Sequence, residues 1–300
     1  MGVAGFPFSS PKAFYEWVDL CEGSAIDSIW FSERLVSSSP NLEPMTAMAA
    51  VAGRTKRLKF GMNAIVLPFR DPLILAKECA TLDYLSGGRL LPAFGVGNEN
   101  APEFGATGRN PQGRGAYSDE VILCLTRFWN EERVTHEGAH FRYHDVTITP
   151  RPVQRPLPVW IGGSSEAAIR RTARLGSGWL AGLQSPAQVR PVVAAIRRES
   201  LAAGRPIDDD HYGAGFAFRF GSVDEPEVQR STKAFARIPG APDPLAYLAV
   251  GDAAAIAARA AEYVDAGISK FVLRPVAESD EGWMEQTRRL IEEVIPLVHA

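Results

Sequence analysis

Short apolar runs alternate along the chain with longer stretches in which apolar residues recur at helical spacing. In the first long stretch, Phe14, Trp17, Val18 and Cys21 share one helical face, directly after a Ser10-Pro11 pair that is typical of a helix start. Strands are predicted at residues 3–8, 28–32, 58–64, 90–96, 158–161, 178–181, 212–220 and 270–274, each followed by a helical stretch.

Eight strand–helix pairs in succession are typical of a closed (β/α)8 barrel, the TIM barrel, formed here as one domain over residues 1–300. An open, doubly wound sheet has the same alternation and is the alternative, because strand count alone does not show closure. The intervals 98–158, after the fourth strand, and 221–251, after the seventh, are too long for plain connections. We predict that both are insertions, and such loops commonly form lids.

Composition and charge argue against several classes of function. Apolar residues make up 46% of the 300 residues, and the formal net charge is −3. The basic residues are scattered and the apolar runs are short, so we expect no nucleic-acid partner and no membrane span. Lys12, Glu16 and Asp19 stand where a secretory leader would be apolar. The three cysteines form no CxxC pair, so we expect unpaired, buried thiols in a cytoplasmic protein.

Two motifs suggest other chemistry but lack its structural context. Residues 136–140 read HEGAH and match the HExxH zinc pattern, but Gly138 and strand-forming flanks favour a hairpin over the helix which that pattern needs. We therefore expect no metal. Gly95 and Gly97 resemble the start of a dinucleotide fingerprint, but Asn100 stands at the third glycine. The pair instead indicates a backbone that a flat ring can approach closely.

The stretch WIGGSS, residues 160–165, ends a predicted strand with two glycines and opens a helix with two hydroxyls. Free backbone N–H groups and the helix dipole suit such a turn to phosphate. A plain helix cap at Ser164 or Ser165 is the alternative. Barrels more often bind phosphate after strands seven and eight, whereas this turn follows strand five. We predict a phosphate site at Gly162, Gly163, Ser164 and Ser165.

Polar side chains follow the second and fourth predicted strands: Ser32, Glu33 and Arg34, then Asn98 and Glu99. Catalytic residues of barrel enzymes gather at the carboxyl ends of strands, so Glu33, Arg34 and Glu99 are candidate catalytic residues. Arg34 stays protonated and would stabilise an anionic substrate oxygen, while Glu99 would donate or accept a proton. The alternative is that Glu33 and Arg34 form ion pairs and that Glu99 faces solvent.

Several stretches together resemble a known family. They are DSIWFSE at 27–33, FGMNAIVLP at 60–68, LAKECATLDYLSGGR at 75–89, PRPVQ at 150–154 and PVWIGG at 158–163. In this order they resemble the bacterial luciferase-like superfamily of flavin- and deazaflavin-dependent oxidoreductases. Residues 210–216, DHYGAGF, further resemble the branch that uses coenzyme F420, a deazaflavin.

The resemblance implies a barrel with the cofactor ring at its carboxyl-end mouth, covered by insertions. It implies ring contacts from Asn63, Ala64, Gly97 and Asn98, and a non-proline cis bond between Asn63 and Ala64. It also implies a small-molecule substrate and a homodimer formed through early barrel helices. Arg34 stands where many relatives carry His, and Asn98 where many carry Trp, Arg or Glu, which bears on substrate and chemistry more than on fold.

Two classes of function follow. The first is an oxidoreductase that transfers a hydride between an organic substrate and coenzyme F420. An FMN-dependent monooxygenase is the alternative within this class, because FMN permits oxygen activation whereas a deazaflavin is confined to two-electron transfer. The second class is a non-catalytic flavin-binding barrel that keeps the Gly162-Gly163 anchor and closes the space beside the ring. Turnover of a substrate separates the two classes.

Overall fold

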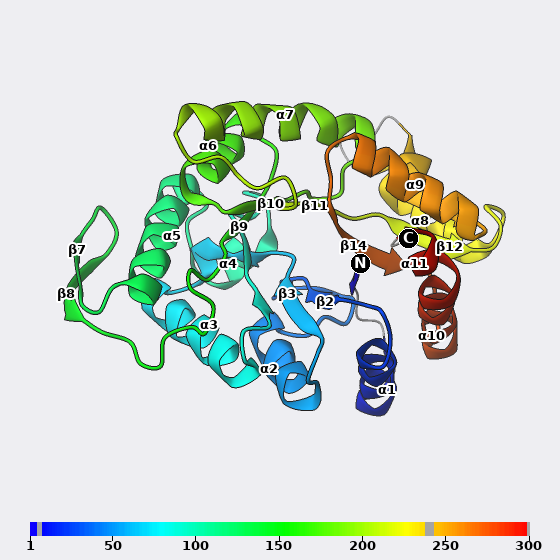
Figure 1. Cartoon of the computed structure of the whole chain (residues 1–300), viewed down its shortest axis with the longest axis horizontal. Coiled ribbons are helices and arrows are strands. Elements are labelled where there is room, and N and C mark those ends of the chain that lie inside the picture. Colours follow the sequence, from blue (N-terminus) through cyan, green and yellow to red (C-terminus); the bar gives the residue numbers. More distant parts are fainter. Residues whose placement is uncertain (5–7, 238–242, 299–300) are drawn as a thin grey trace.

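The computed structural model describes residues 1–4, 8–237 and 243–298, so part of the first predicted strand, residues 5–7, lies outside the described residues. Helices surround the strands (Figure 1). The strands are β1 (Gly2–Ala4), β2 (Ser28–Phe31), β3 (Lys59–Met62), β4 (Ile65–Val66), β5 (Leu90–Leu91), β6 (Ala93–Gly95), β7 (Val134–Glu137), β8 (Arg142–Val146), β9 (Trp160–Gly162), β10 (Gly178–Leu180), β11 (Tyr212–Ala214), β12 (Ala217–Phe220), β13 (Leu248–Gly251) and β14 (Lys270–Pro275). The α-helices are α1 (Pro11–Glu22), α2 (Pro44–Arg54), α3 (Pro72–Ser86), α4 (Pro102–Ala106), α5 (Arg114–Asn130), α6 (Glu166–Leu175), α7 (Pro186–Ala202), α8 (Pro226–Phe235), α9 (Ala253–Asp265), α10 (Asp280–Arg289) and α11 (Ile295–Val298).

The main sheet is parallel and curls round. On one side β14 pairs with β1, β1 with β2, and β2 with β3. On the other side β14 pairs with β11, followed in order by β10, β9 and β6. The first path ends where β3 pairs with β5, and the second ends where β6 pairs with β4. The predicted α/β fold with a curled, mostly parallel sheet is confirmed.

Three predicted strands are each interrupted once. The third divides into β3 and β4 at the Asn63–Ala64 bond, which is cis, as the resemblance implied. The fourth divides at Pro92, which has no N–H to donate to the ladder. The seventh divides at Gly215, where a Cβ would lie 2.1 Å from the carbonyl oxygen of Val272. The backbones of the seventh and eighth strands therefore approach too closely there for a side chain.

Helix starts lie where the capping signals predict them. Ser10 Oγ accepts a hydrogen bond from the N–H of Ala13 at 3.2 Å. Asp71 Oδ1 accepts from the N–H of Leu73 at 2.9 Å. Asp252 Oδ1 accepts from the third residue of α9 in the same way. Each cap satisfies a backbone donor that has no partner within the helix, so these starts are fixed by local sequence.

The two long intervals have structure of their own. Residues 98–158 include α4, α5 and the antiparallel hairpin β7–β8, which projects at the left of Figure 1. The predicted hairpin at residues 136–140 is thus confirmed, and His136 Nε2 lies 3.0 Å from Glu120 Oε1 of α5. Residues 221–251 include α8 and β13, which pairs in parallel with β12.

Two further expectations concern the cysteines and the membrane. Cys21, Cys79 and Cys124 are buried and unpaired, which confirms the prediction for the thiols. Within the described ranges, no helix is long and apolar enough to cross a membrane.

Two indole rings fill the interior of the curled sheet, and glycines on neighbouring strands make room for them. A Cβ at Gly2 would lie 2.7 Å from Nε1 of Trp30, and a Cβ at Gly61 would lie 2.6 Å from Cε3 of the same ring. A Cβ at Gly178 would lie 2.5 Å from Cε2 of Trp160. These glycines are therefore required by space and not by an unusual φ.

We expect Gly61→Ala to lower the free energy of unfolding by about 2 kcal/mol, as overpacked cores do. The new Cβ would meet the Trp30 ring on one side and the carbonyl oxygen of Leu91, at 2.9 Å, on the other. Gly53→Ala in α2 is the matched control, because nothing lies within 4 Å of its Cβ and alanine favours a helix. Urea unfolding of both variants measures the difference. Wild-type stability of Gly61→Ala would show that the interior repacks without cost.

Candidate active site

A cavity lies at each end of the curled sheet, and side chains of β2 and β14 that face the interior line both cavities. Successive side chains of a strand point to opposite faces, so every second residue faces the interior. Ser28 and Lys270 line the cavity at the amino ends of the strands, and Arg274 lines the cavity at the carboxyl ends. Trp30 and Val272, between these positions, line both cavities. One layer of side chains therefore separates the two.

The carboxyl-end cavity has a volume of about 830 Å³, within the range of sites for small organic molecules. Arg34 and Asn63 of the predicted site residues line it. Its walls also include Ser32, Ser39, Asn41, Leu42, Ala181, Gly182, Leu183, Phe216 and Ala217. The other predicted residues, which are not among its lining residues, are Glu33, Ala64, Gly97, Asn98, Glu99, Gly162, Gly163, Ser164 and Ser165.

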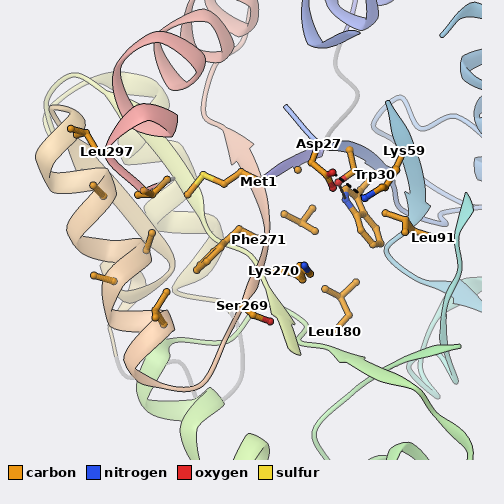
Figure 2. A pocket seen from close by; sticks show the side chains of 18 of the residues that line it. Met1, Asp27, Trp30, Lys59, Leu91, Leu180, Ser269, Lys270, Phe271 and Leu297 are labelled. Carbon is orange, nitrogen blue, oxygen red and sulfur yellow. Dashed lines mark hydrogen bonds and ion pairs between the residues drawn. The ribbon is translucent and has the colours of Figure 1, made fainter. Parts of the chain in front are cut away.

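The amino-end cavity is of similar size, about 780 Å³ (Figure 2). In Figure 2, Trp30 and Leu91 lie on one side of it and Leu297, from the last helix, lies on the other. Lys59 Nζ pairs with Asp27 Oδ1 at 3.2 Å beside Trp30. Barrel enzymes carry their chemistry at the carboxyl ends of the strands, and this cavity holds none of the predicted site residues. We therefore assign the candidate active site to the carboxyl-end cavity.

Small residues on neighbouring strands lie close to one another next to Asn63 at the carboxyl ends. A Cβ at Gly95 would lie 3.7 Å from the Cβ of Ala64, and a Cβ at Gly162 would lie 4.0 Å from it. The nearest atoms to a Cβ at Gly162 are carbonyl oxygens at 3.6 Å, so a Cβ there would make ordinary contacts and not clash. We call Ala64, Gly95 and Gly162 the small-residue surface, and its shape suits a planar ring.

The turn after the small-residue surface leads into α6. Gly163 has φ +101°, and its carbonyl oxygen accepts a hydrogen bond from Trp179 Nε1 at 2.7 Å. Ser165 Oγ accepts from the N–H of Ala168 at 3.3 Å, so Ser165 is the helix cap that the sequence offered as an alternative. A phosphate site at this turn stays a prediction. The start of α6 is exposed, and it follows the small-residue surface, where larger side chains would take up space. These two features fit a cofactor that has both a ring and a phosphate.

Glu33 is buried and connects to the backbone beside the small-residue surface. Its Oε2 accepts the N–H of Val66 at 2.6 Å, and its Oε1 accepts from Arg70 Nε at 3.0 Å. Arg70 also donates to Glu43 Oε1 at 2.7 Å. Burial raises the pKa of the Glu33 carboxyl above its ordinary value, and the charge of Arg70 opposes this effect. The ion-pair interpretation of Glu33 thus holds, with Arg70 and not Arg34 as its partner.

The residues after β6 lie toward solvent. Gly97 has φ +70°, and a Cβ there would lie 2.8 Å from Cγ1 of Val66. Asn98 is exposed, and its Oδ1 accepts the N–H of Asn100 at 3.0 Å. Glu99 has 62% of its side chain exposed and pairs with Arg114 Nη1 at 3.2 Å. A catalytic role for Glu99 stays a prediction, and this placement favours the solvent-facing alternative.

Arg274, which the sequence analysis did not single out, lines the carboxyl-end cavity. It lies near the end of β14, where the strand-end rule that selected Glu33 and Arg34 applies equally. The strand-end pattern in the sequence therefore also indicated Arg274, because it is the last residue of the eighth predicted strand.

Comparison with known proteins decides the family. Residues 4–239 match the model of the luciferase-like monooxygenase family. The chain belongs to this family. The resemblance seen in the sequence is confirmed, and this luciferase-like chain is a member of a family of oxidoreductase enzymes.

Named relatives include coenzyme F420 enzymes. The luciferase-like chain is 26% identical over 206 residues to the F420-dependent glucose-6-phosphate dehydrogenase of Kineococcus radiotolerans, covering 65% of this chain and 60% of that one. It is 34% identical over 142 residues to the protein of the same name from Intrasporangium calvum, covering 45% and 42%. The chain thus spans 60% or less of the length of these relatives.

Solved structures share the fold. A monooxygenase from Streptomyces bottropensis superposes with a TM-score of 0.85 at 23% identity, covering 100% of the luciferase-like chain and 99% of that chain. The coenzyme F420 dependent tetrahydromethanopterin reductase of Methanopyrus kandleri superposes with a TM-score of 0.78 at 18% identity, covering 99% of each chain. At these identities the likeness shows the fold alone.

Proposed function

We propose that the protein is an oxidoreductase that transfers a hydride between a small organic substrate and coenzyme F420. The observation that carries the proposal is the small-residue surface of Ala64, Gly95 and Gly162, in which Ala64 follows Asn63 of the carboxyl-end cavity and Gly162 precedes the turn into α6. Relatives named as F420-dependent favour the deazaflavin. An FMN-dependent monooxygenase is the alternative, since monooxygenases share this fold.

In this proposal each part of the site has a distinct task. The small-residue surface would face the ring, and backbone N–H groups of Gly163, Ser164 and Ser165 would bind the phosphate. Bound cofactor supplies or accepts the hydride. Arg34 stays protonated and would stabilise negative charge on a substrate oxygen. Glu33 would act as a positioning residue, because it fixes the N–H of Val66 just after Ala64.

We also propose that the curled sheet is a closed (β/α)8 barrel forming one domain, with 98–158 and 221–251 as its insertions. The parallel pairing of β14 with both β1 and β11 supports closure. A cytoplasmic homodimer remains part of the proposal. Ile74, Tyr84 and Leu85 of α3 are exposed, which supports an interface on this early helix. A monomeric mass by sedimentation would contradict the dimer.

Separate titrations of the purified protein with coenzyme F420 and with FMN test the cofactor. We expect the dissociation constant for F420 to be at least about tenfold lower than that for FMN. Tight FMN binding without measurable F420 binding would reverse the choice in favour of the alternative. Turnover of any substrate by the loaded protein excludes the non-catalytic flavin-binding barrel, and the open volume of about 830 Å³ favours that outcome.

A further inference from the structure

The carboxyl-end cavity has an unbalanced charge. Its charged lining residues are Arg34, Arg274 and Glu278. Glu278 is not a free carboxylate, because Arg230 binds both of its oxygens, with Nη2 at 2.6 Å from Oε2. Glu278 is thus paired with an arginine outside the lining, and the lining holds no unpaired acid beside the two cavity arginines.

The guanidinium groups of Arg34 and Arg274 have no hydrogen-bond or ion-pair partner among the side chains and backbone groups that the structure describes. Residues 5–7 and 238–242, whose positions are not described, carry no charged side chain. No carboxylate of those segments can therefore balance the two guanidinium groups.

Arg274 has an exposed side chain that lines the cavity, and protein atoms around its guanidinium displace part of the surrounding water. Burial lowers the pKa of its guanidinium, and no opposite charge offsets that effect. An arginine nevertheless stays protonated at any working pH. An unpaired guanidinium that has lost part of its hydration binds an anion favourably, because the anion supplies hydrogen-bond acceptors and opposite charge.

The two arginines lie on the opposite side of the sheet from the predicted phosphate turn. Arg34 follows β2 and Arg274 lies near the end of β14, and β1 pairs between these two strands. The turn at Gly163 follows β9, and β14, β11 and β10 lie between β1 and β9 in the sheet. The cofactor phosphate therefore has a separate set of donors, and the arginines remain for another anion.

We infer that the substrate carries a carboxylate or phosphate group, which Arg34 and Arg274 bind at the β14–β1–β2 side of the carboxyl-end cavity. Guanidinium groups present fork-shaped donors that match the oxygens of both groups. This inference rests on the proposed function, since it names the substrate class of the same site. Arg274 would then bind the substrate. Arg34 would bind a negative charge that the substrate always carries, in addition to the charge that develops on a substrate oxygen during the reaction.

Calorimetric titration with benzoate, phenyl phosphate and neutral benzamide tests the inference, with the cofactor-saturated protein and with the cofactor-free protein. We expect at least one of the two anions to bind about tenfold or more tighter than benzamide. The anion that binds more tightly distinguishes a carboxylate from a phosphate substrate. Arg274→Met and Arg34→Met should each reduce that preference about tenfold. Arg274→Lys should keep most of it, because the charge remains.

Arg198→Met, which changes an exposed arginine of α7, is the matched control and should leave all three affinities unchanged. Equal affinities of the anions and benzamide in the wild-type protein would overturn the inference. So would unchanged anion binding in both methionine variants, or a loss of cofactor affinity in Arg274→Met with anion binding intact. If no cofactor binds the wild-type protein, the proposed function fails, while the cofactor-free titrations still decide whether the arginines bind anions.

Discussion

Gly162→Val is expected to weaken cofactor binding by a factor of about 100 or more while the protein stays folded. The valine Cβ would meet only carbonyl oxygens at 3.6 Å and Ala64 at 4.0 Å, which are ordinary contacts. Gly162 has no positive φ, so its backbone accepts a side chain. The γ-methyl groups would project into the space that we assign to the ring and would prevent its approach.

Absorbance titration with coenzyme F420 and with FMN measures this effect, and circular dichroism verifies the fold. Gly162→Ala should give an intermediate loss, because a single methyl group occupies less of the ring space. Gly53→Val, at an exposed helical position away from the cavity, is the control for a general effect of valine. If Gly162→Val binds the cofactor as tightly as the wild-type protein does, the ring does not lie on the small-residue surface.

Glu33→Ala has the second large expected effect, a loss of about 3 kcal/mol in the free energy of unfolding. The change removes the acceptor of the Val66 N–H and one of the two carboxylates that bind the guanidinium of Arg70. Both groups are then buried without a full set of partners, which costs more than the loss of an exposed ion pair.

Glu99→Ala is the matched comparison, because Glu99 was predicted from the same strand-end pattern and its carboxylate is exposed. Its removal should change stability by less than about 0.5 kcal/mol, as for other surface ion pairs. Urea unfolding of the two variants measures the contrast. A Glu33→Ala protein as stable as Glu99→Ala would mean that the contacts of Glu33 do not hold the backbone near Ala64.

The fold was largely predictable because its signals are local. Caps such as Ser10 and Asp71 and the short apolar runs lie within a few residues of the elements that they define. The predicted strand limits were wrong where contact with a neighbouring strand, and not the local sequence, sets the end of a strand. Gly215 interrupts the seventh strand because Val272, far away in sequence, lies 2.1 Å from the position of its missing Cβ.

The candidate site was predictable only in part, for the same physical reason. Strand-end position selected Arg34 and Glu33, but it did not show that Glu33 faces away from the cavity. That orientation depends on Arg70, which is 37 residues away along the chain. Arg274 has the same strand-end signal as Arg34, yet its lack of a partner becomes visible only when Glu278 is seen bound to Arg230.

Trp30 and Val272 line both cavities, and Trp30 is the larger of the two, so the depth of the candidate site depends strongly on the side chain at position 30. A smaller residue at this position would thin the layer of side chains that separates the two spaces, without any change in strand number or pairing. The glycines at positions 2 and 61 would then lose their contacts with the indole, although Ser28 Oγ and the carbonyl oxygen of Leu91 would still lie close to a Cβ at these positions. A few compensating substitutions in the interior can therefore change the length of the substrate that this fold accepts. The residues that take part in the reaction need not change.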